Sequence, residues 1–269
     1  MIIVFAGAAK GQTGTTANIS AIAAMFALEE KGKLLLMHAQ HRNRDLEHAF
    51  LEKEYVNKVS ELFKDTGLDG LYRFSNLKNK GEDSISRYTT NIISNKLDLL
   101  IGSQNTNSSL FEKEFFACYS FIKNNYKKEY RAVFIDAGGG SQEIANCLLA
   151  EADLAVINAN QNMNLLEEVF GKHYPKIKER GYVLIGNYNN SSRYSIKAIE
   201  KGFKVKERIG AVYYNREFAD AYCEGRALEF IIRNYENDKQ DYNYNFVKQL
   251  KTSVKYISKA IKAKEELCG

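Results

Sequence analysis

Residues 2–37 constrain the fold more than any other stretch of the sequence. Residues 2–6 and 33–37 are apolar runs of the kind that form buried strands. Between them lie a loop that contains three glycines and a helical pattern that ends at a lysine followed by glycine. A strand, loop, helix and second strand in this order form the repeating unit of a parallel sheet. The sequence therefore predicts an α/β fold.

Short apolar runs recur further along the chain, with helical stretches between them. They cover residues 97–101, 132–135, 154–157, 182–185 and 209–213. This alternation predicts a doubly wound, mostly parallel sheet with helices on both faces. The length of 269 residues and the hydrophobic content of 45% suit a single domain, residues 1–269. The more polar segment 57–97 interrupts the rhythm, and we expect a helical insertion there after the second strand.

The end of the chain predicts a basic amphipathic helix over residues 244–267. Six apolar residues fall at helical spacing, and lysines occupy most of the remaining surface. The apolar positions are Phe246, Val247, Leu250, Val254, Ile257 and Ile261. Two interpretations are open: the apolar face packs on the sheet, or the helix lies on an anionic membrane surface.

The composition points to a cytoplasmic protein. The four cysteines lie far apart without a CxxC pair, which is typical of reduced thiols. Residues 1–9 lack the basic start of a signal peptide, and the longest nearly apolar run, residues 19–28, is too short to span a bilayer. Lys and Arg number 38 against 33 Asp and Glu, a formal charge of +5. That mild excess gives no specific support for nucleic-acid binding.

The loop after the first strand has features of a phosphate-binding loop. It reads Ala9-Lys10-Gly11-Gln12-Thr13-Gly14-Thr15-Thr16 and leads directly into a helix. Free backbone N–H groups and the helix dipole meet at such a helix start, and glycine lets the backbone approach phosphate oxygens closely. Two residues depart from the P-loop pattern GxxxxGK[ST], because Thr15 replaces the lysine and Ala9 replaces the first glycine.

In its context, this loop resembles the deviant Walker A loop, KGGxGK[ST], of the MinD/ParA family of P-loop ATPases. Lys10 matches the family's signature lysine, and Thr16 matches the residue that binds Mg²⁺. Gly11 and Gly14 match two loop glycines, whereas Gln12 and Thr15 depart from the pattern. The GQTGTT form is similar to an atypical branch that includes the TadZ/CpaE-type proteins, which localise pilus assembly. The resemblance implies that residues 10–16 bind ATP or ADP together with Mg²⁺.

The resemblance extends in order and spacing over residues 1–232. Residues 42–46 match the RNxDL ending of a MinD-like switch, with His38 where an aspartate would orient the attacking water. Asp136 ends a hydrophobic strand and resembles the Walker B aspartate near Mg²⁺. Asn187 resembles the residue that reads the adenine edge, although ordinary turn chemistry explains it equally well. Tyr214 lies in a segment similar to the one that closes over the base.

This resemblance implies a homodimerising ATPase in which Lys10 and Asp136 are catalytic and Thr16 and Asp136 hold the metal. Such a protein recruits a protein partner at a membrane or cell pole, with peripheral membrane contact. Thr15 lacks the cation that would neutralise charge developing between the β- and γ-phosphates, and His38 lacks the carboxylate expected to position water. We therefore expect a nucleotide-gated dimerising switch with slow or absent hydrolysis.

Three alternatives stay open. One is a pseudo-ATPase scaffold without useful nucleotide affinity, and another is an ATPase of the chromosome or plasmid partition type. The third is a Rossmann oxidoreductase, which the glycines Gly7, Gly11 and Gly14 suggest. Their spacing is not GxGxxG, and the second strand ends in Met37-His38 without a ribose-binding acid, so this alternative ranks last.

Overall fold

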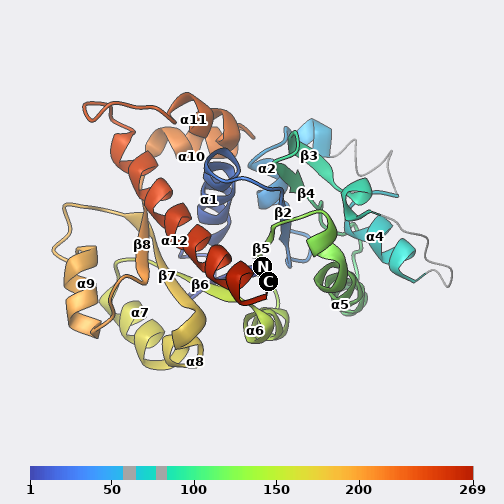
Figure 1. Ribbon diagram of the computed structural model, residues 1–269, viewed down its shortest axis with the longest axis horizontal. Helices are drawn as coiled ribbons and strands as arrows, with labels where there is room; N and C mark the ends of the chain where they lie inside the picture. Colours follow the sequence, from blue (N-terminus) through green and yellow to red (C-terminus); the bar gives the residue numbers. More distant parts are fainter. Residues whose placement is uncertain (57–64, 77–83, 269) are drawn as a thin grey trace.

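The computed structural model describes residues 1–56, 65–76 and 84–268, and it contains a central sheet covered by helices on both faces (Figure 1). Within these residues the sheet has eight strands in the order β3-β4-β2-β5-β1-β6-β7-β8. All neighbouring strands pair in parallel except β3 and β4. The strands are β1 (Ile2–Gly7), β2 (Leu34–His38), β3 (Thr90–Ile93), β4 (Leu97–Leu99), β5 (Ala132–Asp136), β6 (Leu154–Ala159), β7 (Gly181–Tyr188) and β8 (Ile209–Tyr213). The predicted doubly wound α/β fold is confirmed.

Strand β3 is an element that the sequence did not predict. It lies in segment 57–97, where we expected a helical insertion, and it pairs antiparallel with β4 at the edge of the sheet. The described part of this segment also holds helix α4 (Gly67–Ser75) and a 3-10 turn, Ile85–Tyr88. The remainder of the segment lies outside the described residues. The described insertion is thus mixed rather than helical, and the four residues of β3 are too few to give a clear periodic signal.

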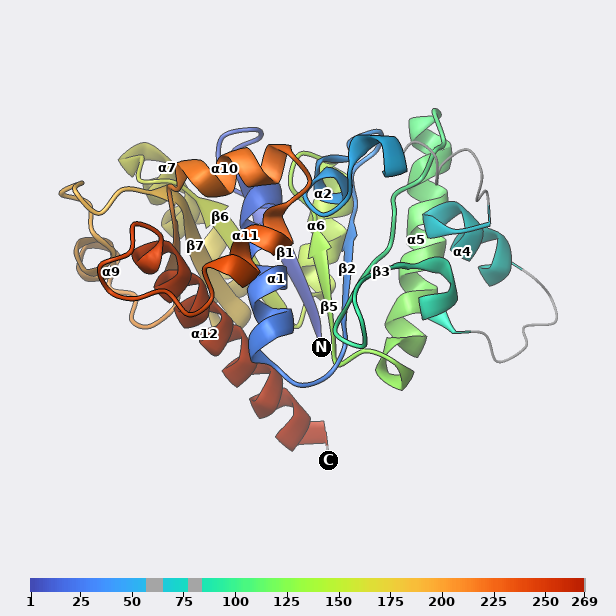
Figure 2. The same cartoon turned by 90° about the horizontal axis from the view of Figure 1, so that it is seen from above.

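The helices divide between the two faces of the sheet (Figures 1 and 2). Apolar side chains of the first group pack in one cluster on one face, and those of the second group pack in two clusters on the other. The first group is α1 (Thr15–Glu29), α2 (Asp45–His48), α10 (Arg216–Cys223), α11 (Ala227–Arg233) and α12 (Tyr244–Cys268). The second group is α4, α5 (Ser108–Asn125), α6 (Gln142–Glu151), α7 (Met163–Glu168), α8 (Tyr174–Ile177) and α9 (Ile196–Phe203).

Helix α12 occupies the range in which the sequence predicts an amphipathic helix. All six of its predicted apolar residues are buried, each at most 4% exposed, and they pack against α1 and β8. Ion pairs of Lys264 with Asp153 and of Glu265 with Arg131 hold its end beside the sheet. The apolar face is therefore part of the core, which favours the packing interpretation over a membrane-surface helix. In the described part of the chain, no helix is both long and apolar enough to cross a bilayer.

The strand order brings the loops after β1, β2 and β5 together at one edge of the sheet. β5 lies between β1 and β2, and Asp136 at its end is in register with Phe5 on one side and His38 on the other. In a Rossmann sheet of order 3-2-1-4-5-6, the first and second strands are neighbours instead. The topology therefore removes support for the oxidoreductase alternative.

Candidate functional site

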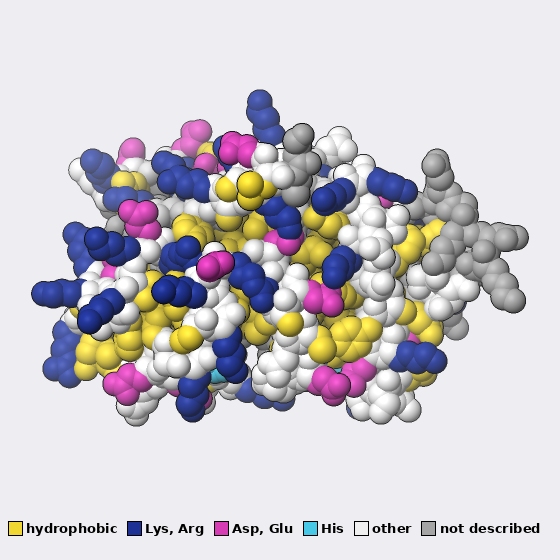
Figure 3. All heavy atoms as spheres, turned by 60° about the horizontal axis from the view of Figure 1, so that its bottom comes forward, with side chains coloured by type: hydrophobic (Ala, Val, Ile, Leu, Met, Phe, Trp, Pro, Cys, Tyr) yellow, Lys and Arg dark blue, Asp and Glu magenta, His cyan; other side chains and the backbone are white. Residues whose placement is uncertain are grey.

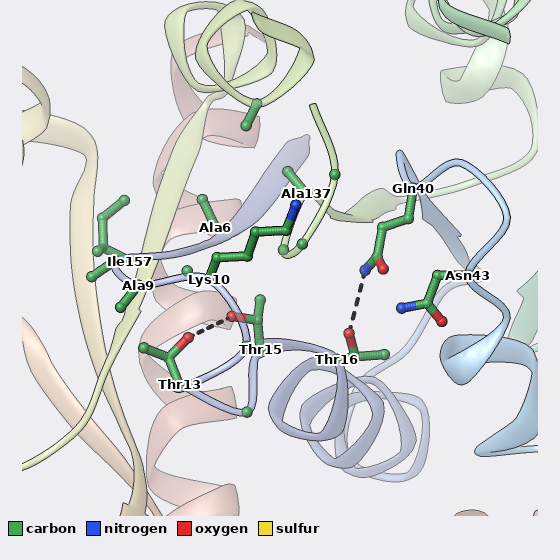
Figure 4. A pocket seen from close by; sticks show the side chains of 18 of the residues that line it. Ala6, Ala9, Lys10, Thr13, Thr15, Thr16, Gln40, Asn43, Ala137 and Ile157 are labelled. Atoms are coloured by element: carbon green, nitrogen blue, oxygen red, sulfur yellow. Dashed lines mark hydrogen bonds between the residues drawn. The ribbon is translucent and has the colours of Figure 1, made fainter. Parts of the chain in front are cut away.

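A cavity of about 400 Å³ opens where the loops after β1, β2 and β5 meet (Figure 4). The loop between β1 and α1 forms one wall, and the turn at residues 137–140 after β5 forms another. Gln40, Asn43 and Asp45, which follow β2, line a third side, and α6 contributes Asn146. The volume lies in the range of small-molecule ligand sites.

Two glycines in the left-handed conformation shape the loop between β1 and α1. Gly11 has a φ of 70° and Gly14 a φ of 62°, which side-chain-bearing residues adopt rarely. Gly14 also caps the amino end of α1. Within the described chain, the backbone N–H groups of Gly11, Thr13 and Gly14 have no hydrogen-bond acceptor. Free amides at a helix start, together with the helix dipole, form a site for an anion.

Behind the loop, a buried polar network fixes its shape. The hydroxyl oxygens of Thr13 and Thr15 lie 3.0 Å apart, and both side chains are buried. A Cβ on Gly7 would lie 2.9 Å from each of these oxygens, so only glycine fits there. The amide of Asn18 donates to the carbonyl of Thr13 at 3.1 Å and to Oδ1 of Asn158 at 3.0 Å. The protein itself therefore supplies the contacts that order the loop.

Lys10 is exposed on the loop, and Figure 4 shows its side chain extending across the cavity toward Ala137. Among the described residues that line the cavity, it is the only Lys or Arg. Thr15, at the position of the P-loop lysine, has its hydroxyl directed toward Thr13 instead. Lys10 is thus the residue that brings an ammonium group to this site.

Thr16, Gln40 and Asp136 meet on the other side of the loop. The amide nitrogen of Gln40 donates to Oδ2 of Asp136 at 2.9 Å and to Oγ1 of Thr16 at 3.3 Å. The other carboxylate oxygen of Asp136 accepts the Gly138 N–H at 2.8 Å. Burial raises the pKa of Asp136 to about 6, although hydrogen bonds from Thr16 and Gly138 and the nearby His38 act in the opposite direction.

The structure separates His38 from the side chains that meet at the cavity. His38 does not line the cavity; its Nε2 lies 2.9 Å from Oε1 of Glu47, and its Nδ1 accepts the backbone N–H of Gln40 at 3.2 Å. Gln40, two residues later, is the side chain that reaches Thr16 and Asp136. Strand β2 ends at His38, so the loop that turns toward the cavity begins only after it.

Known structures share this architecture, whereas no family model and no curated protein matches the sequence. The ParA family ATPase from Chlorobium tepidum TLS superposes with a TM-score of 0.65 and 13% identity, over 94% of this chain and 98% of its own. A chain of the MinC:MinD cell division complex of Aquifex aeolicus superposes with a TM-score of 0.65 and 17% identity, over 96% of this chain and 95% of its own. The septum site-determining protein MinD of Pyrococcus horikoshii OT3, complexed with Mg-ADP, superposes with a TM-score of 0.59 and 14% identity. The match covers 100% of this chain and 98% of that protein. This chain has the fold of the MinD and ParA ATPases.

Two residues that the resemblance to MinD and ParA assigned to the base do not line the cavity. Asn187 lies at the end of β7 with a φ of 49°, and its Nδ2 is 3.9 Å from the position of a Cβ on Gly14. It therefore sits beside the loop. Tyr214 is 62% exposed, and its backbone N–H donates to the carbonyl of Tyr188. The structure brings Asn187, but not Tyr214, to the loop between β1 and α1.

Other lining residues belong to no MinD or ParA motif that the sequence revealed. The polar ones are Gln142, Asn146, His173 and Tyr222. Tyr222 comes from α10, and its hydroxyl donates to the carbonyl of Asp45 at 3.1 Å across 177 residues of sequence. Only the folded arrangement brings this residue to the site, so no local sequence signal marks it.

Proposed function

We propose that this protein is an ATP- or ADP-binding switch of the MinD/ParA type, whose loop between β1 and α1 encloses the phosphates. One observation carries the proposal: the free amides of Gly11, Thr13 and Gly14 line the same cavity as Thr16. A triphosphate needs several N–H donors that converge beside a metal-binding oxygen. The Mg-ADP bound to MinD of Pyrococcus horikoshii, which has the same fold, supports this choice of ligand.

The oxygen donors of the site fit a Mg²⁺ ion. Oγ1 of Thr16 and Oδ2 of Asp136 lie close together, because both contact one nitrogen of Gln40. Hydroxyl and carboxylate oxygens are ligands that Mg²⁺ accepts. Thr16 would hold the ion directly, and Asp136 would hold it directly or through water. When bound, Mg²⁺ supplies positive charge that neutralises the phosphate oxygens.

We infer that hydrolysis is slow or absent. Thr15 replaces the lysine of the loop, and the side chain that reaches Thr16 and Asp136 from the loop after β2 is the neutral amide of Gln40. Lys10 supplies the remaining ammonium, either to its own cavity or across a homodimer. In this account nucleotide binding gates dimerisation rather than driving turnover.

A nucleotide-gated dimer of this kind recruits a protein partner that belongs to a membrane-associated or polar assembly, with the switch itself cytoplasmic or peripheral to the membrane. The GQTGTT loop supports the atypical branch that positions pilus or secretion assemblies. Copurification with and without ATP, followed by mass spectrometry, tests this assignment. A partner retained only with ATP supports a localisation factor.

Calorimetry with Mg-ATP separates the switch from a pseudo-ATPase scaffold. Wild type should bind with micromolar affinity, and Lys10→Ala should weaken binding by about tenfold, because a charge-assisted contact to phosphate is lost. Lys31→Ala is the control, since Lys31 is exposed beyond the opposite end of α1. Absence of heat with every nucleotide would leave the scaffold as the better description.

A partition-type ATPase is the second candidate, and an uneven charge distribution favours it. Residues 171–208 contain ten Lys and Arg against three Glu, a net +7, whereas the whole chain carries +5. Figure 3 shows Lys and Arg side chains crowding the left end of the molecule, over the α7–α9 region. Such a surface favours an anionic partner.

Fluorescence anisotropy with a DNA duplex tests this second candidate. Binding that weakens steeply with salt, and that is lost in a Lys201→Glu/Lys204→Glu double variant, would support it. Lys255→Glu on α12 is the control, because Lys255 is equally exposed but lies on another surface. No binding at low salt would exclude the partition role.

A further inference from the structure

Gln40 lies at the centre of the site, and its residue type alone does not explain why it is there. Its side chain is only 4% exposed, and its one amide nitrogen joins α1, through Thr16, to the end of β5, through Asp136. Its amide oxygen faces the turn after β5, 3.5 Å from the position of a Cβ on Gly139. Gln40 therefore connects all three segments that form this side of the cavity.

The buried Asp136 carboxylate needs hydrogen-bond donors, and the Thr16 hydroxyl and the Gln40 amide are two of them. Asp136 is fully buried, and a buried carboxylate is strongly destabilising unless hydrogen-bond donors satisfy its oxygens. The Gly138 N–H satisfies Oδ1, and the Gln40 amide satisfies Oδ2. A cation in place of the Gln40 amide would also interact favourably with the Asp136 carboxylate. The amide does so by donating hydrogen bonds, without carrying a net charge.

We propose that Gln40 is a positioning residue that holds Thr16 and Asp136 together and makes assembly of the site largely independent of a divalent cation. The inference deepens the proposed function and rests on it for its nucleotide consequences. A switch built in this way keeps its phosphate loop and the turn after β5 joined in the absence of metal. Nucleotide affinity then depends weakly on Mg²⁺.

The backbone around Gln40 supports a fixed position for its side chain. The Gln40 N–H donates to Nδ1 of His38, and the Nε2 of His38 lies 2.9 Å from Glu47, which also accepts the Gly102 N–H at 2.9 Å. His38 and Glu47 are both buried. These contacts anchor Gln40 from the side opposite the cavity. They fix the position from which its side-chain amide reaches Thr16 and Asp136.

The first experiment uses Mn²⁺ alone, without nucleotide, and follows binding by electron paramagnetic resonance on the full chain. Gln40→Glu replaces the amide with a carboxylate of the same shape, and should bind Mn²⁺ at least about tenfold more tightly than wild type. Gln142→Glu is the matched control, because Gln142 lines the same cavity but bonds to Asn146 and not to Thr16 or Asp136. Equal Mn²⁺ affinity in wild type and Gln40→Glu would overturn the proposal.

The second experiment measures ATP affinity by calorimetry in Mg²⁺ and in EDTA. Wild-type affinity should change by less than about threefold, whereas Gln40→Leu, which removes the amide without adding charge, should lose at least about tenfold in EDTA. A wild-type affinity that falls tenfold in EDTA would overturn the proposal. If no variant binds ATP, the proposed function fails, and the Mn²⁺ experiment still decides the role of Gln40.

Discussion

The hydroxyl oxygens of Thr13 and Thr15 lie 3.0 Å apart inside the loop between β1 and α1, and both side chains are buried. Thr15 stands where the P-loop pattern has its lysine, so the loop is closed here by a neutral pair of hydroxyls. The turn after β5 packs against the same residue, because a Cβ on Gly138 would lie 2.7 Å from Cβ of Thr15. The space that the ammonium group of a P-loop lysine would occupy is thus filled by Thr15, which packs against Gly138 and forms a hydrogen bond with Thr13.

Thr15→Lys should raise both ATP affinity and the rate of hydrolysis. An ammonium group at this position would neutralise charge on the β- and γ-phosphates, which the hydroxyl cannot do. Thr15→Met is the control, since methionine has a similar length without the charge. Phosphate-release assays and calorimetry should separate the two variants. Equal behaviour of the lysine and methionine variants would show that another defect, such as the neutral Gln40, limits the rate.

Gly7→Ala should distort the loop. Its Cβ would lie 2.9 Å from both the Thr13 and Thr15 hydroxyl oxygens, so one of them must move and their hydrogen bond breaks. We expect a loss of about 1–3 kcal/mol in unfolding free energy, together with weaker nucleotide binding. Gly171→Ala is the control, because a Cβ there would meet no atom within 4 Å. Urea denaturation that fails to distinguish the two variants would contradict the described loop.

Asp136→Asn should change the pH dependence of stability. The pKa of Asp136 is raised by burial to about 6, above its value of roughly 3.9 in an unfolded chain. Between these values the folded state binds more protons than the unfolded state, so wild-type stability falls as pH rises from about 4 to about 6, by roughly 3 kcal/mol.

Denaturant titrations at several pH values test this expectation. Wild type should lose stability as the pH rises, and so should the control Asp238→Asn, which alters an exposed carboxylate. Any change in stability that all three proteins share comes in addition to this loss. Asp136→Asn should lack this pH-dependent loss, because its side chain does not titrate. Parallel profiles for all three would indicate that Asp136 is not a buried acid.

Leu250→Ala should destabilise the whole domain, because α12 is part of the core. The Leu250 side chain is fully buried among residues of α1 and β8. Loss of its packing should lower the unfolding free energy by about 2–5 kcal/mol, while Lys255→Ala on the exposed side should change it by less than about 0.5 kcal/mol. Similar small effects from both would mean that α12 is only loosely attached, and would return the membrane interpretation to consideration.

The parts of the site that follow local pattern were predictable from the sequence. The run of residues 2–6, the glycine loop and the helix after it are contiguous, so their order alone placed Lys10 and Thr16 at a helix start. Asp136 was recognisable because a carboxylate at the end of a buried strand is unusual. The sheet followed from its hydrophobic strands in the same way.

The remaining parts depend on tertiary structure. The choice between His38 and Gln40 depends on where β2 ends and which way the next loop turns. Tyr222 reaches the cavity from α10 only after folding, and β3 forms because β4 offers it an edge. The hydrophobic face of residues 244–267 is compatible with either a core or a membrane, and the position of α1 and β8 decides between them.

Backbone amide resonances of the ¹⁵N-labelled protein, followed during addition of Mg-ATP, show whether the loop between β1 and α1 binds the phosphates. We expect the N–H signals of Gly11, Thr13 and Gly14 to shift or broaden first, because these free groups would donate to phosphate oxygens. Signals of Lys255 and Lys259 on the exposed side of α12 should stay in place. Unchanged signals from the loop at millimolar nucleotide, or shifts centred on another surface, would contradict phosphate binding by this loop.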